Sequence, residues 1–132
     1  LKDQPDHMDE VPFFRYVHVA DTKRKALDNT KKHVDWIQDI MQWRRNLVES
    51  TEVHLPMEKW RDERNELPPD NQYISEKRAF IGTPEAVAEK IMMLKDHGIS
   101  YFGCNFAMGG ISQEEVIRSM KLFEKKVIPL IS

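Results

Sequence analysis

Cysteine is nearly absent from this chain, whose 132 residues include a single one, Cys104. A lone cysteine excludes an internal disulfide framework and cannot supply a cysteine-rich zinc site. Long apolar runs are missing too, because no segment approaches the roughly 20 consecutive apolar residues of a membrane-spanning helix. Residues 1–7 lack the basic and apolar regions of a secretory signal. The sequence therefore predicts a cytoplasmic protein with no membrane partner.

A net excess of charge is also missing. Twenty Lys and Arg face 22 Asp and Glu, and the isoelectric point is about 6.2. This balance provides no electrostatic attraction to nucleic acid or anionic lipid. The five histidines show no HExxH or paired metal spacing, and the chain has no glycine-rich phosphate loop and no GxSxG motif. We therefore expect no nucleic-acid partner and no metal site.

What the sequence does contain is an alternation of strand and helix signals. Strands are predicted where aromatic and β-branched residues cluster, over 13–20, 78–81 and 99–107. Helices are predicted at the apolar periodicities that follow, over 23–48, 84–97 and 112–128, with Pro129 ending the last one. The nearly uncharged strand 99–107 is expected to be buried on both faces. Repeated strand–helix units imply parallel strands and an α/β sheet.

The segment 49–77 interrupts this alternation. It is highly charged and contains Pro56, Pro68 and Pro69, which break any long helix. We expect a short helix over 57–65 and little other intrinsic structure. A connection of this length inside a compact domain is usually a functional lid or an insertion.

Several short strings in this order resemble the carboxyl-terminal end of the bacterial-luciferase-like flavin monooxygenases. The strings are Val19-Ala20-Asp21-Thr22, Phe80-Ile81-Gly82-Thr83-Pro84-Glu85, Gly98-Ile99-Ser100, Ser119-Met120-Lys121-Leu122-Phe123 and Val127-Ile128-Pro129. The pattern extends over residues 12–131 and is specific between 80 and 130. One departure weakens a light-emitting interpretation, because Ala107 stands where the luciferase catalytic subunit has an acidic residue.

The resemblance implies a (β/α)8 barrel of the TIM type, which needs about 250 residues. The 132 residues would then be the carboxyl-terminal portion, about three strand–helix units, of a luciferase-like barrel. The amino-terminal barrel segment would be the missing part of the same molecule, which we favour, or another chain. The remaining alternative is that the pattern has been reused in a smaller domain.

The family resemblance also implies site residues, beginning with Tyr16 and His18. These two lie on one face of the first predicted strand, near its carboxyl end, where a barrel has its active site. They are therefore the candidate catalytic residues, with His18 contacting the flavin or the substrate. The alternative is a barrel-filling aromatic layer with a structural histidine.

Candidate cofactor contacts follow the last strand, at Asn105, Phe106, Gly109 and Gly110. Amides at a glycine turn before a helix can bind phosphate, and barrels often place one there. The luciferase-like enzymes hold the flavin phosphate chiefly from their middle strands, so the alternative that we favour is a plain turn and helix cap at Gly110 and Ser112. The candidate lid and substrate residues are Trp60, Arg61, Lys77 and Arg78, which would otherwise belong to a solvated loop.

The function implied by the resemblance is oxidation of a small organic substrate by O2 and reduced FMN, or less favourably the deazaflavin F420. The residues for the catalytic step would lie mostly in the missing segment, so this chain alone is expected to be inactive. A flavin reductase would supply the reduced FMN, and the protein would form a homo- or heterodimer. The competing hypotheses are a non-catalytic α/β interaction module and a relative that has lost the flavin site.

Overall fold

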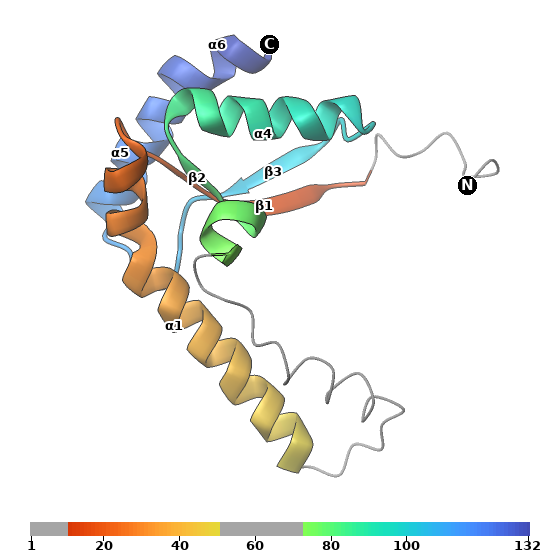
Figure 1. The fold of residues 1–132 in the computed structure, drawn as a ribbon, viewed down its shortest axis with the longest axis vertical. Helices are drawn as coiled ribbons and strands as arrows, with labels where there is room; N and C mark the ends of the chain where they lie inside the picture. Colours follow the sequence, from red (N-terminus) through yellow and green to blue (C-terminus); the bar gives the residue numbers. More distant parts are fainter. Residues whose placement is uncertain (1–10, 51–72) are drawn as a thin grey trace, which may run out of the picture.

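The computed structural model describes residues 11–50 and 73–132. In this part of the chain a three-stranded parallel sheet is formed by β1 (Phe13–Val19), β2 (Phe80–Gly82) and β3 (Phe102–Asn105). The helical elements are α1 (Lys23–Ser50), η2 (Ile74–Arg78), α4 (Pro84–Asp96), α5 (Gln113–Leu122), η3 (Phe123–Val127) and α6 (Ile128–Ile131). The expected α/β class with parallel strands is confirmed (Figure 1).

Local capping explains where the helices begin. The Thr22 hydroxyl accepts a hydrogen bond from the Lys25 amide at 3.1 Å at the start of α1. Thr83 and Ser112 cap α4 and α5 in the same way. Each cap satisfies one of the amides that a helix start leaves without an intrahelical partner. The helix starts expected at 23, 84 and 112 are therefore confirmed to within one residue.

The strand order is β2-β1-β3, so the first strand is central. β2 pairs with the carboxyl end of β1, with Val17 opposite Phe80, whereas β3 pairs with the amino-terminal half, with Phe13 opposite Phe102. In a (β/α)8 barrel each strand lies beside the strands before and after it. Three consecutive barrel strands would place the second strand in the centre. The described sheet therefore has parallel strands, as a βα fragment would, but its strand order differs from that of three consecutive barrel strands.

Two hydrophobic clusters cover the two faces of the sheet. On the face that we call the α4 face, Val17, Val19 and Phe80 pack against α4 and the carboxyl-terminal helices. On the opposite face, the α1 face, Ala20 and Ile81 pack with α1 residues and Met108. Figure 1 shows α4 along one side of the sheet and α1 running from its other side to beyond the strands.

The α1 face is covered only at its carboxyl end. Phe14, near the start of β1, is 59% exposed, and its ring lies over Gly103 of β3, where a Cβ atom would come within 2.1 Å of it. The expectation that the last strand is buried on both faces is wrong, because β3 residues are half-buried or exposed. β3 is an edge strand, and within the described residues nothing covers the α1 face beside it.

The last helix does not end before Pro129, contrary to expectation. It continues from α5 through the wider turn η3 into α6, and Pro129 lies in the first turn of α6. A π-helical turn changes the hydrogen-bonding ladder, and a helix start tolerates the missing proline N–H. The proline is therefore accommodated without breaking the helix.

Candidate functional site

His18 is the most deeply buried polar group at the carboxyl end of β1. It is 1% exposed, on the α1 face of the strand. Its Nε2 lies 3.3 Å from the Asn29 side-chain nitrogen, which also donates to Glu115 at 3.0 Å. An amide nitrogen carries two hydrogens, so it can donate to both neighbours, which leaves the His18 proton on Nδ1. Nδ1 is buried, and no described residue accepts a hydrogen bond from it.

The environment of His18 favours the neutral imidazole. Burial lowers its pKa from the ordinary 6.5, the Glu115 carboxylate opposes this shift, and His33 adds to it. A neutral imidazole with one accepting and one donating nitrogen suits the chain of contacts from His18 through Asn29 to Glu115. Because it is sealed from solvent, His18 would act on a ligand through Asn29 rather than by direct contact.

We expect the free energy of unfolding to fall as the pH is lowered through 6.5, the ordinary pKa of the imidazole. The unfolded imidazole takes up a proton there, whereas the buried one resists it, so protons favour unfolding. The contribution has a slope of at most about 1.4 kcal/mol per pH unit and is fully present above pH 6.5. Urea unfolding between pH 5 and 7.5 measures it. His18→Gln should remove this slope, and a slope unchanged from the wild type would contradict the assignment; exposed His97→Gln is the control.

A half-open pocket of about 230 Å³ lies beside this chain of contacts, between the first turns of α1 and one side of α5. Asn29 and Glu115 line it and connect it to His18. The other lining residues are Val19, Ala20, Asp21, Lys25, Arg118, Lys121, Leu122 and Lys125. Ligands of open α/β sheets bind at the carboxyl ends of the strands. The pocket lies at the carboxyl end of β1, and its position therefore makes it a candidate ligand site.

A buried hydrogen bond holds the two sides of the pocket together. The Ser119 hydroxyl on α5 accepts from the Val19 amide at the end of β1 at 2.8 Å. Arg118, one residue earlier, binds the carboxylates of Glu114 and Glu115. The Ser119–Val19 hydrogen bond joins positions 100 residues apart. Sequence analysis did not identify Ser119, Asn29 or Arg118 as site residues. Glu115 lies within the helix expected over 112–128, but it was not identified as a site residue either.

The other candidate catalytic residue, Tyr16, lies on the same strand face as His18 and is half-buried. Its partner across the strand pair is Asn105 of β3. Asn105 is exposed, and its side-chain oxygen accepts from the Ala107 amide at 3.1 Å. The structure therefore brings Tyr16 and Asn105 side by side, at the uncovered part of the α1 face.

Phe106 does not join them. Its ring packs edge-on against Phe123 at 5.4 Å, within the cluster on the α4 face. Because its ring packs on the α4 face, Phe106 does not fit a cofactor site on the α1 face.

The turn at Gly109 and Gly110 is held by α1. The Gly109 carbonyl oxygen lies 2.7 Å from His33 Nδ1, and a Cβ on Gly109 would meet the Trp36 ring at 2.1 Å. Gly110 has a φ of +77°, which favours glycine, and Ile111 donates back to Met108 at 2.8 Å. Packing and turn geometry thus explain both glycines without a phosphate ligand, and the phosphate site expected from the sequence stays a prediction.

The candidate lid residues are described only in part. Trp60 and Arg61, together with the helix expected over 57–65, lie outside the described residues. Lys77 and Arg78 are exposed on η2, just before β2. Lys90 of α4 donates to the Glu76 and Ala79 carbonyl oxygens at 2.7 and 3.1 Å and so attaches η2 to the body of the fold.

Cys104 faces the α4 cluster, and burial raises the pKa of its thiol from 9.0 to about 11. The thiolate is the reactive form, and its fraction near pH 8 is lower in the folded chain than in urea. A more basic thiolate is also more nucleophilic, so we expect alkylation by iodoacetamide about tenfold slower in the folded chain. Equal rates in both states would show that the thiol is accessible and ionised, and would make Cys104 a candidate nucleophile.

No family model matches this chain, and no curated protein matches it either. Over residues 11–50 and 73–132, no group of three or more His, Cys, Asp or Glu side chains is placed to hold a metal ion. Among the helices of the same residues, none has the length and apolar character needed to cross a bilayer.

Proposed function

We propose that the chain forms the carboxyl-terminal part of a luciferase-like, flavin-dependent monooxygenase. A TIM-barrel core would require β2 between β1 and β3, an order that the described sheet does not have, so the proposal does not rest on the strand order. The observation that carries the proposal is the α1 face of β1 and β3, where Tyr16 and Asn105 lie together beside a sheet edge that no described residue covers. Further strands would complete this sheet and turn the α1 face into the wall of an enclosed pocket. The ordered sequence strings that resemble the family support the same interpretation.

In this proposal the chain's own residues shape the pocket rather than hold the flavin phosphate. Tyr16 presents its half-buried ring and hydroxyl to the α1 face, while the His18–Asn29–Glu115 contacts hold a neutral imidazole at the carboxyl end of β1. Reduced FMN, or F420 as the alternative, supplies the electrons for O2 activation when bound. Phe106, Gly109 and Gly110 take no part. The protein would be a cytoplasmic dimer that receives reduced FMN from a flavin reductase.

Tyr16→Phe in the longest natural form of the gene product tests the proposal. Oxygen consumption is followed with a flavin reductase, NADH, FMN and a panel of small organic substrates. The change removes only the hydroxyl, so we expect substrate-dependent oxygen uptake to fall by about tenfold or more, while the stability changes little. The exposed Tyr101→Phe is the matched control and should retain full activity.

Absence of flavin- and substrate-dependent oxygen uptake in the wild-type protein would reject the proposal. The second candidate, a non-catalytic interaction module, rests on the same open β3 edge and the 59% exposed Phe14. An uncovered strand edge can pair with a strand of another chain. A flavin-binding measurement distinguishes the two candidate functions, because only the monooxygenase requires flavin.

A further inference from the structure

The pocket at the carboxyl end of β1 gathers more positive than negative side chains. One cation comes from α1, two come from α5 and one comes from η3, against two carboxylates. The cations are Lys25, Arg118, Lys121 and Lys125, and the carboxylates are Asp21 and Glu115. The chain as a whole has a net charge of −2. The positive charge here is therefore a local concentration rather than a reflection of composition.

The cations of the pocket differ in how they are paired. Arg118 is occupied by Glu114 and Glu115, and Lys25 lies 3.6 Å from Asp21. Within the described part of the chain no carboxylate pairs with Lys121 or Lys125. These two lysines are four residues apart on one helix, where like charges repel. An anion between them would remove that repulsion.

The walls of the pocket restrict the size and character of its ligand. Val19, Ala20 and Leu122 provide an apolar side. The volume of about 230 Å³ is below the roughly 300–1,000 Å³ of pockets for drug-sized molecules. A flavin nucleotide is too large for it. The ligand should therefore combine an anionic group with a short apolar body.

The chemistry of the free cations selects the anionic group. Arginine matches planar carboxylates by a two-pronged contact, but the Arg118 guanidinium is already held by its own glutamates. Lysine ammonium groups act as separate point charges and are common phosphate ligands. A phosphoryl group carries a charge of about −1.5 to −2 and three acceptor oxygens. The unpaired Lys121 and Lys125 complement this charge, and Lys25, which lies 3.6 Å from Asp21, would be shared between that carboxylate and the anion.

We propose that this pocket binds a small phosphomonoester, with its phosphoryl group between Lys25, Lys121 and Lys125 and its organic group against Val19 and Leu122. Asn29 and Glu115 form a fixed polar floor, because the Asn29 amide donates to Glu115 and faces His18. Glu115 repels an anion less than a free carboxylate would, since Arg118 neutralises it. This site requires neither flavin nor the oxidation proposed above.

Calorimetric titration of the longest natural form of the protein with phenyl phosphate tests the proposal. We expect saturable binding of one equivalent, weaker binding of inorganic phosphate, and no binding of phenol. The double variant Lys121→Gln/Lys125→Gln should bind phenyl phosphate at least about tenfold more weakly, because two charge-assisted contacts are lost. The matched variant Lys32→Gln/Lys95→Gln removes two exposed lysines outside the pocket and should stay within about twofold of the wild type.

Three results would overturn the proposal: no saturable binding, binding of inorganic phosphate as tight as that of phenyl phosphate, or equal weakening in both double variants. The lysines are exposed, so the variants should fold, and thermal unfolding of each checks this. Lys125→Gln alone provides the same comparison if the double variant unfolds. Because no flavin is present, the outcome is independent of the monooxygenase proposal.

Discussion

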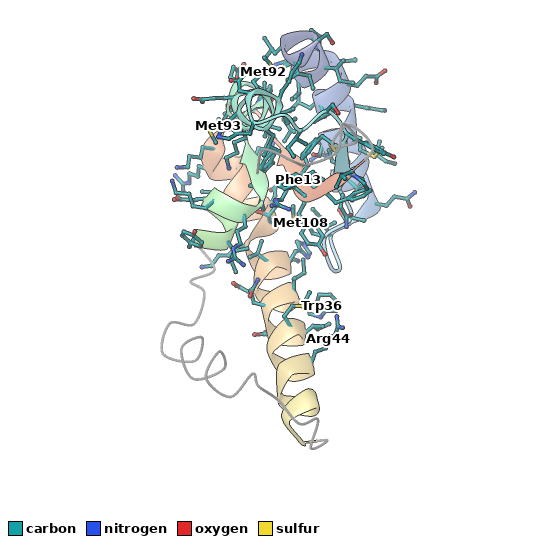
Figure 2. The ribbon with its side chains drawn as sticks, turned by 90° about the vertical axis from the view of Figure 1, so that its right-hand side faces the viewer. Phe13, Trp36, Arg44, Met92, Met93 and Met108 are labelled. Atoms are coloured by element: carbon teal, nitrogen blue, oxygen red, sulfur yellow. The ribbon has the colours of Figure 1, made fainter. Side chains whose placement is uncertain are left out.

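Met108→Ala is expected to lower the free energy of unfolding by about 2–5 kcal/mol, the range for truncating a large buried side chain. Met108 is 1% exposed and packs in the cluster on the α1 face with Ala20, Ile81 and Val34. It follows β3 directly, so it joins the edge strand to α1. Figure 2 shows its side chain beside the strands, whereas Met93 lies on α4, away from this cluster. Urea unfolding followed by circular dichroism measures the loss.

Met93→Ala is the matched control, because Met93 is 58% exposed and loses the same atoms. Surface truncations of this kind usually change stability by less than about 0.5 kcal/mol. Met108→Leu nearly conserves the volume and should cost less than about 1.5 kcal/mol. A loss for Met108→Ala no larger than that for Met93→Ala would contradict the packing of α1 against the sheet.

Ser119→Ala is expected to cost about 1–3 kcal/mol, although it removes a single oxygen atom. The Ser119 hydroxyl accepts from the Val19 amide in the buried joint between β1 and α5, and alanine would leave that amide without its partner. Leaving a buried donor unsatisfied carries most of its desolvation penalty. The loss should appear in equilibrium unfolding and as faster hydrogen exchange of the Val19 amide.

Ser100→Ala provides the comparison, since Ser100 is exposed before β3 and its hydroxyl has no structural partner among the described contacts. Ser119→Thr keeps the hydroxyl and adds a methyl group. It therefore distinguishes the effect of losing the hydrogen bond from the effect of changing the side-chain volume. If the Val19 amide exchanged at the wild-type rate in Ser119→Ala, the hydroxyl would not be its acceptor.

Elements with strong local signals could be predicted from the sequence. The first strand and the long helix after it follow from side-chain type and periodicity, and Thr83-Pro84-Glu85 marks the start of α4 through capping alone. Capping and periodicity are local, so they are readable without knowledge of the fold. The parallel α/β class follows from the alternation of these elements.

Properties that depend on neighbours could not be predicted in this way. The apolar run 99–107 indicates a buried strand, but its burial depends on what lies beside it, and β3 is at an edge. The central position of β1 likewise follows from pairing between distant segments. The expectation that Pro129 ends the last helix is wrong, because a proline can also occupy the first turn of a helix. Here the helix continues through η3, and Pro129 lies in the first turn of α6.

The candidate site shows the same division. His18 could be selected from its position near the carboxyl end of a strand, but its partners Asn29 and Glu115 lie on two helices and are 86 residues apart. No local pattern links them. In the sequence Lys121 of α5 and Lys125 of η3 look like part of an ordinary charged helix surface. They line a pocket only because α1 lies beside them.

Binding of reduced FMN tests the central claim, that this chain is part of a flavin enzyme, most directly. Fluorescence of FMN is titrated, with and without reductant, against the 132-residue chain and against the longest natural form of the gene product. The account predicts saturable binding of reduced FMN by the long form and none by the isolated chain, whose residues provide a pocket wall. Absence of binding by the long form, together with a monomeric and cooperatively folded 132-residue chain, would contradict it and favour an independent interaction domain.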